Sequence, residues 1–347
     1  MVVIGRDGGE GETVEFGRYR APDGSAGAHV ELDCEHPHAA LVVGKRGYGK
    51  SYTLGVLAEG LAAARGVAPV VVDPMGVFET LAADGGRASV VPEPRVDPGA
   101  LPPTAWCDLV GLDPESAAGA ALWRAAATAS TLSGVDDALV DLDCTRGARR
   151  AARNHVALAR SWDVFDPDGL DAAELASDRA TVLDVSGRPR AAANAVVRAV
   201  ASTCYRGRSS GTVDRLPWLL LDEAHAFFGG VAEPALRTVL TRGRQPGVSL
   251  VAATQRPGAL PDVAASQADV LVVHRLTDRS DRAALERARP SYAGTELAES
   301  MPTRPGDVTV VDDATERVHA VRVRERETPH GGGSPRASEA TGPECIK

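Results

Sequence analysis

Apolar positions occur in two patterns along this chain, and the two patterns alternate. Short, nearly continuous apolar segments fall at residues 39–43, 68–72, 181–185, 218–221, 248–253 and 269–273. Such segments are typical of strands that are buried on both faces of a parallel sheet. Between them, apolar residues recur at helical spacing, as in residues 50–65, where Leu54, Leu57 and Leu61 share one face. Strands that alternate with helices predict an α/β fold with a mostly parallel central sheet.

The two ends of the chain show a different pattern, in which apolar and polar residues alternate. Residues 13–19 and 29–33 alternate on either side of a Pro-Asp-Gly turn, so we expect a short N-terminal β-hairpin region over residues 1–38. A second hairpin is predicted from residues 307–311 and 318–324. The main domain then spans residues 39–325. The tail, residues 326–347, contains a Gly-Gly-Gly-Ser-Pro run and is predicted to be disordered.

Residues 85–180 interrupt the strand pattern and predict an α-helical insertion. Prolines at positions 92, 94, 98, 102 and 103 predict a loop, and Ala-rich helices are predicted from Asp113 onward, at 135–142 and at 148–161. The insertion carries one basic cluster, made of Arg146, Arg149, Arg150 and Arg153. Either a solvated helix face or a contact with nucleic acid explains this cluster.

The segment from Gly44 to Ser51 fits G-x-x-x-x-G-K-[ST] and lies between a predicted strand and a predicted helix. This is the setting of a phosphate-binding P-loop, in which glycines let backbone N–H groups point at a phosphate and the helix N-terminus adds a positive dipole end. Lys50 then reaches the β- and γ-phosphates of ATP, and Ser51 holds Mg²⁺. An ordinary glycine turn before a helix is the alternative explanation.

Two further strand ends carry the polar residues that ATP hydrolysis requires. The apolar segment 218–221 is followed by Asp222 and Glu223, as in a Walker B strand. We expect Asp222 to hold the metal and Glu223 to act as the base that activates the attacking water. Gln255 follows the next predicted strand, where a polar side chain can report the state of the γ-phosphate.

Composition narrows the class of partner. The net charge of −9 argues against bulk electrostatic binding of nucleic acid, so contact with DNA requires a local basic patch. No apolar run approaches the roughly 18 residues of a membrane span, and the N-terminus lacks a signal-peptide core, so we expect a cytoplasmic protein without a membrane partner. The five cysteines contain no C-x-x-C pair, which argues against a disulfide framework or a zinc site.

Taken together, these motifs resemble the HerA/FtsK superfamily of P-loop ATPases, in particular the HerA-like branch. The resemblance spans roughly residues 39–325. Arg-x-x-Gly followed by Thr-Gln-Arg-Pro is what singles out this branch. The segments that carry the resemblance are Leu41–Gly44 before the P-loop, Val72–Pro74, Leu221–His225, Gly243–Gly247, Ala253–Pro257 and Ser266–Asp269.

The resemblance implies a RecA-like sheet with the Walker B strand beside the P-loop strand, and a homo-oligomer, a hexameric ring, that binds ATP between neighbours. Arg244 is implied as a catalytic finger that acts on the adjacent subunit, with Arg242 in reserve; the alternative is an arginine that pairs with surface acids. Since such fingers are worth roughly 10³ to 10⁵ in rate, isolated subunits should be nearly inert. The expected nucleotide-binding residues are Gly44, Lys45, Arg46, Gly47, Tyr48, Gly49, Lys50, Ser51 and Tyr52.

Two departures from the family pattern bear on the function. The 38 N-terminal residues are too few for the five-stranded barrel that HerA-like translocases usually carry, and Val77 stands where relatives tend to have an acid. We expect Mg²⁺-dependent ATP hydrolysis by a ring ATPase, coupled to DNA translocation or processing, with a nuclease or another protein as partner. The alternative is a nucleotide-dependent switch or scaffold that acts on a protein without moving DNA. A nucleotide kinase is a third class, which would need an Arg-rich lid.

Overall fold

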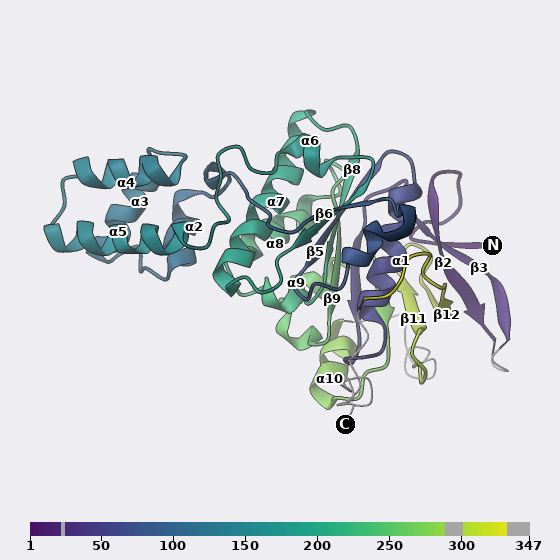
Figure 1. Cartoon of the computed structure of the whole chain (residues 1–347). Coiled ribbons are helices and arrows are strands. Elements are labelled where there is room, and N and C mark those ends of the chain that lie inside the picture. Colours follow the sequence, from purple (N-terminus) through teal and green to yellow (C-terminus); the bar gives the residue numbers. More distant parts are fainter. Residues whose placement is uncertain (22–24, 289–300, 332–347) are drawn as a thin grey trace, which may run out of the picture.

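A computed structural model describes residues 1–21, 25–288 and 301–331 of the chain (Figure 1). Its centre is a twelve-stranded sheet with the order β1-β3-β2-β12-β11-β10-β4-β9-β8-β5-β7-β6. The strands are β1 Val2–Ile4, β2 Thr13–Arg20, β3 Ala26–Asp33, β4 Ala39–Val43, β5 Val67–Asp73, β6 Ala88–Val91, β7 Ala180–Asp184, β8 Leu216–Leu221, β9 Ser249–Thr254, β10 Val270–Val273, β11 Asp307–Asp312 and β12 Arg317–Val323.

The seven strands β10, β4, β9, β8, β5, β7 and β6 form a parallel part of the sheet. The strands β11, β12, β2 and β3 join it through antiparallel pairs. The predicted α/β fold with a mostly parallel central sheet is therefore confirmed. The first 38 residues do not stand apart from it, because β2 pairs with β12 and continues the main sheet.

Helices cover both faces of the sheet, which explains why its central strands are apolar throughout. Leu41 and Val43 of β4 belong to the core on one face, and Ala40 and Val42 belong to the core on the other, as the two-residue period of a strand requires. The helices are α1 Lys50–Ala63, α2 Pro103–Val110, α3 Ala117–Ala126, α4 Leu132–Asp141, α5 Arg146–Arg160, α6 Ala172–Leu175, α7 Arg190–Ser210, α8 Glu233–Arg242, α9 Asp262–Ser266 and α10 Arg279–Ala288.

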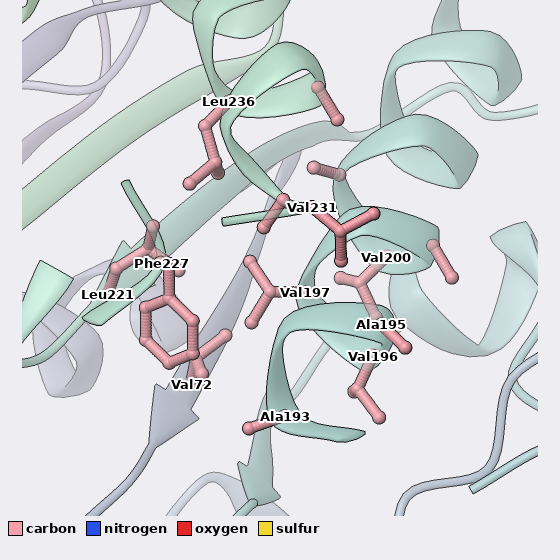
Figure 2. Packing of buried hydrophobic residues seen from close by; sticks show 14 of the residues in the cluster. Val72, Ala193, Ala195, Val196, Val197, Val200, Leu221, Phe227, Val231 and Leu236 are labelled. Carbon is pink, nitrogen blue, oxygen red and sulfur yellow. The ribbon is translucent and has the colours of Figure 1, made fainter. Parts of the chain in front are cut away.

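The helix α7 packs on the face of the sheet opposite to α1. Figure 2 shows Val197 of α7 beside Val231, close to Phe227 and to Val72 and Leu221 of the sheet. The helices α2 to α5 form a lobe that projects from this side of the molecule (Figure 1). The nucleotide motifs lie elsewhere, because they belong to the strand ends and to α1.

Three expectations about local structure need correction. The strand β9 lies between β4 and β8, so the Walker B strand is not beside the P-loop strand. The proline-rich segment contains a helix, α2, because Pro103 occupies a first-turn position where a missing N–H costs nothing. The helix expected from Asp113 begins at Ala117, since the Ser116 side chain accepts the capping hydrogen bond from the Gly119 N–H.

The tail also differs from its description as disordered from residue 326. Arg326 and Thr328 contact Glu59 of α1, as described below. The rest of the predicted tail, residues 332–347, lies outside the described residues.

Candidate functional site

The P-loop connects the C-terminal end of β4 to the N-terminal end of α1. Gly49, the residue before the helix, has φ 103°, a conformation that disfavours side chains with a Cβ atom. Gly44 is required for another reason, because a Cβ there would lie 2.4 Å from Cβ of His274. Both glycines therefore serve the geometry of the loop, which turns its backbone toward the helix N-terminus.

Lys50 and Ser51 meet the Walker B acids at the same edge of the sheet. The carboxyl ends of parallel strands lie together, and Asp222 follows β8 directly. The Ser51 hydroxyl donates a hydrogen bond to Oδ2 of Asp222, with 2.6 Å between the oxygens. A hydroxyl and a carboxylate that converge in this way suit Mg²⁺, which takes few protein ligands and completes its shell with phosphate and water.

Lys50 is buried although it carries a charge. Its side-chain amine donates to the carbonyl of Lys45 at 3.3 Å, within the loop. Burial lowers the pKa of Lys50, while the charges of Glu223 and Asp222 act in the opposite direction. An amine held within the loop, facing two carboxylates, is placed to bind the phosphates of a nucleotide.

Glu223 combines a strained backbone conformation with a buried carboxylate oxygen. It adopts φ 45°, which is uncommon for a non-glycine residue and stores strain. Its Oε2 atom is buried and accepts no hydrogen bond from the described part of the chain, although Nδ1 of His225 lies 3.3 Å away. Burial and the neighbouring Asp222 raise the pKa of Glu223. A carboxylate oxygen that accepts no hydrogen bond, at the end of a strand, is suited to accept a proton from water.

Gln255 follows β9, and this strand lies between the P-loop strand and the Walker B strand. Its side chain is partly buried. The neighbouring Thr254 hydroxyl lies 3.2 Å from Nδ1 of His225, which connects the β9 end to the residue beside Glu223. The structure thus places Gln255 at the same sheet edge as Lys50 and Glu223.

A cavity of about 570 Å³ joins most of these residues. Its lining combines charged side chains with apolar and aromatic ones. Gly44, Lys45 and Tyr48 of the predicted nucleotide-binding set are absent from the lining, and so is Gln255; Lys45 instead donates its N–H to the carbonyl of Arg275 at 2.8 Å, which fixes the loop. The lining is formed by Arg46, Gly47, Gly49, Lys50, Ser51, Asp222 and Glu223, together with Tyr52, Met75, Val77, Pro305, Gly306, Arg322, Val323, Glu325 and His330.

Comparison with known proteins agrees with this geometry. The family described as the central domain of helicase HerA matches residues 18–140, which include the P-loop and end before Asp222. The predicted resemblance to HerA-like proteins is confirmed over this part of the chain, where the sequence is similar to the central domain of helicase HerA.

Solved structures show the same fold for nearly the whole chain. VirB4 of Thermoanaerobacter pseudethanolicus superposes with a TM-score of 0.67 at 17% identity, covering 93% of this chain and 99% of that chain. The plasmid coupling protein TrwB, in complex with ADP and Mg²⁺, gives a TM-score of 0.60 at 16% identity and covers 94% and 98% of the two chains. A search of curated protein sequences found no match.

The two candidate finger arginines of this chain lie away from its own cavity. Arg242 ends α8, and Arg244 follows in the turn that leads to the N-terminal end of β9. That end of a parallel strand is opposite to the edge that carries the P-loop. Both side chains are exposed. Neither arginine is therefore placed to reach the nucleotide of its own subunit.

Sequence reasoning missed the support that β10 gives to the P-loop. His274 and Arg275 follow β10, which pairs with β4. Nε2 of His274 lies 3.1 Å from the Thr53 hydroxyl of α1, and the Arg275 guanidinium lies over the Tyr48 ring at 5.6 Å. Burial, with the nearby Lys50 charge, lowers the pKa of His274 to about 4, so the ring is neutral at pH 7. Its position after an apolar segment was the only indication in the sequence.

The described residues contain neither a cluster of metal ligands nor a helix that could span a membrane. Across residues 1–21, 25–288 and 301–331, no group of three or more His, Cys, Asp or Glu side chains is arranged to hold a metal. A P-loop metal needs no such group, because Ser51 and Asp222 are the expected protein contacts. Within the same ranges, none of the helices has both the length and the apolar character needed to cross a bilayer.

Proposed function

We propose that this chain is an Mg²⁺-dependent ATPase that assembles into a ring and couples hydrolysis to the translocation or processing of DNA. The observation that carries the ATPase part is the 2.6 Å hydrogen bond between Ser51 and Asp222, with Lys50 and Glu223 lining the same cavity. Two pairs of residues that are distant from each other in sequence thereby meet as phosphoryl transfer requires. The complex of TrwB with ADP and Mg²⁺ supports the same ligands.

The residues divide the reaction into recognisable tasks. The P-loop backbone and Lys50 bind the β- and γ-phosphates and offset the charge that develops on them. When bound between Ser51 and Asp222, Mg²⁺ supplies further neutralisation of the phosphate oxygens. Glu223 orients a water for in-line attack on the γ-phosphorus and accepts its proton through the buried Oε2. Gln255, at the end of β9, senses whether the γ-phosphate is present.

Replacement of Glu223 tests this assignment. Glu223→Gln removes the base and keeps the shape of the side chain, so ATP hydrolysis should fall by roughly 10² to 10⁴. ATP binding, measured by fluorescent-nucleotide titration, should persist. Glu79→Gln changes an exposed acid outside the cavity and is the matched control. Turnover of E223Q at the wild-type rate would remove Glu223 from its role.

The ring is supported by where the arginines lie. Arg244 is exposed at the sheet edge opposite to the P-loop, so only a neighbouring subunit can receive it at a nucleotide site. We place Arg244 in the site of the adjacent subunit, with Arg242 as the second choice. The measurement that tests assembly is light scattering with and without ATP, which should detect a larger species, with six subunits expected.

The contact with DNA has one candidate surface, on the lobe of α2 to α5. Arg146 and Arg150 are exposed on α5 and line a hollow of about 470 Å³. Two other arginines there are already engaged, because Arg153 pairs with Asp136 and Arg149 donates to backbone carbonyls of residues 139 and 142. A local basic surface of this kind is what an acidic protein needs to contact phosphates.

A switch or scaffold ATPase that acts on a protein partner is the second candidate. The observation that favours it is that β2 and β3 continue the central sheet, together with the net charge of −9. The ATPase rate with and without duplex DNA separates the two functions. A motor should accelerate several-fold with DNA and lose the effect at high salt, whereas a switch should not respond.

A further inference from the structure

The cavity is lined in part by the last described residues of the chain. Residues 324–331, which we call the C-terminal strap, follow β12 and run beside α1 (Figure 1). Glu325 and His330 of the strap line the cavity, together with Val323 at the end of β12. The strap therefore belongs to the same cavity as the P-loop, although about 270 residues separate them in the sequence.

A single carboxylate on α1 anchors the strap. Glu59 has a side chain that is 5% exposed, and it accepts hydrogen bonds from both side chains and backbone of the strap. The strongest contacts are with Arg324 at 3.0 Å and with the Thr328 hydroxyl at 2.6 Å. Arg326 and the N–H groups of Glu327 and Thr328 complete the set. Burial raises the pKa of Glu59, but the bonds from Thr328 and its neighbours outweigh burial and lower the pKa.

The anchored strap positions an aromatic pair in the lining of the cavity. The Arg326 N–H donates to the Tyr52 hydroxyl at 2.7 Å, and the rings of Tyr52 and His330 meet edge to face with centroids 5.3 Å apart. Tyr52 comes directly after Ser51, so the pair adjoins the P-loop. Partial burial and the nearby Arg326 charge lower the pKa of His330, which favours the neutral ring that stacks well.

We propose that Tyr52 and His330 form the nucleobase subsite of this cavity and that the C-terminal strap, anchored by Glu59, completes it. The inference rests on the proposed function, because it takes Lys50 and Ser51 as the phosphate site. A ligand with charged phosphates and a flat aromatic base matches a lining that combines these polar residues with two aromatic rings. The planar base stacks against Tyr52 and His330, and Pro305 and Val323 supply the apolar wall.

The test compares a ligand that has a base with one that has none. ADP and inorganic tripolyphosphate both occupy a P-loop, but only ADP reaches the proposed subsite. His330→Ala and Glu59→Ala should each raise the Kd for ADP by about 5- to 100-fold, the range expected for loss of one stacking contact. The Kd for tripolyphosphate should change less than twofold. Isothermal titration of the full chain measures both constants.

Matched variants keep the outcomes distinct. His36→Ala removes a histidine whose side chain is 60% exposed and far from the cavity lining, and should leave both constants unchanged. E59A removes a buried anchor and can fail to fold. H330A changes an exposed side chain of the strap, so it tests the subsite even in that case. If H330A leaves ADP binding unchanged, or weakens ADP and tripolyphosphate equally, the subsite is refuted while the P-loop assignment stands. If the wild type binds neither ligand, the proposed function fails as well.

Discussion

A buried histidine at the start of the P-loop strand makes the stability of this protein dependent on pH. His38 precedes β4 and has a side chain that is 3% exposed. Its Nε2 lies 3.1 Å from Asp33, and its Nδ1 lies 3.0 Å from Asp269, so each ring nitrogen faces a carboxylate. The protonated ring satisfies both contacts, since both nitrogens then donate.

The size and sign of the effect follow from the pKa. Burial alone would lower the pKa of His38, but the hydrogen bonds to Asp269 and Asp33 raise it to about 9. An unfolded histidine titrates near 6.5. The folded state therefore holds an additional proton between these values, and unfolding becomes easier as pH rises through about 9. The shift corresponds to roughly 3 kcal/mol of unfolding free energy, fully present below pH 6.5.

Urea unfolding at pH 6 and at pH 9.5 measures this contribution. Wild type should lose about 3 kcal/mol between the two conditions, whereas His38→Gln should lose much less, because no proton is bound at this position. His29→Gln, an exposed histidine beside Glu15, is the control and should follow the wild type. If H38Q and wild type show the same change with pH, the proton is not held between the two carboxylates, and the reasoning fails.

Two further predictions concern the site. Arg244→Ala should lower the rate of ATP hydrolysis by about 10³ while ATP binding is retained. Mixing R244A with E223Q should restore part of the rate, because the E223Q subunit supplies the arginine and the R244A subunit supplies the base. If the mixture does not recover activity, the arginine acts within its own subunit. Gly49→Ala should weaken ATP binding by about tenfold or more, because the backbone angle φ 103° is strained for alanine. Gly147→Ala is the control, since it adds a Cβ in open space, and it should leave ATP binding unchanged in the same titration.

The P-loop and the Walker B strand were predictable because their chemistry is local. A glycine pattern between strand and helix, and two acids after an apolar run, are written in consecutive residues. The order of the strands in the sheet could not be predicted in this way. The segments that become β4, β8 and β9 are all apolar on both faces, so nothing in them states that β9 lies between the other two. Strand order depends on contacts between distant segments.

The C-terminal strap also depends on a contact with a distant segment, which its own sequence does not reveal. Its composition is that of a disordered tail, and the tail was predicted to begin at residue 326. The partner that orders it, Glu59, is 269 residues from Thr328 in the sequence. Composition predicts whether a segment can form its own core, but it does not report a buried carboxylate elsewhere that accepts the segment's hydrogen bonds.

The geometry of one subunit constrains how the proposed ring is built. The P-loop, the Walker B acids and Gln255 lie at the carboxyl edge of the parallel strands, and Arg244 lies at the opposite edge, before β9. A subunit that offers its nucleotide site on one edge and its arginine on the other can satisfy both only in head-to-tail contacts. Such contacts are heterologous, so they close into a ring or extend into a filament. Two-fold pairing would leave the arginine far from any nucleotide, so an active symmetric dimer would contradict the proposed trans arrangement.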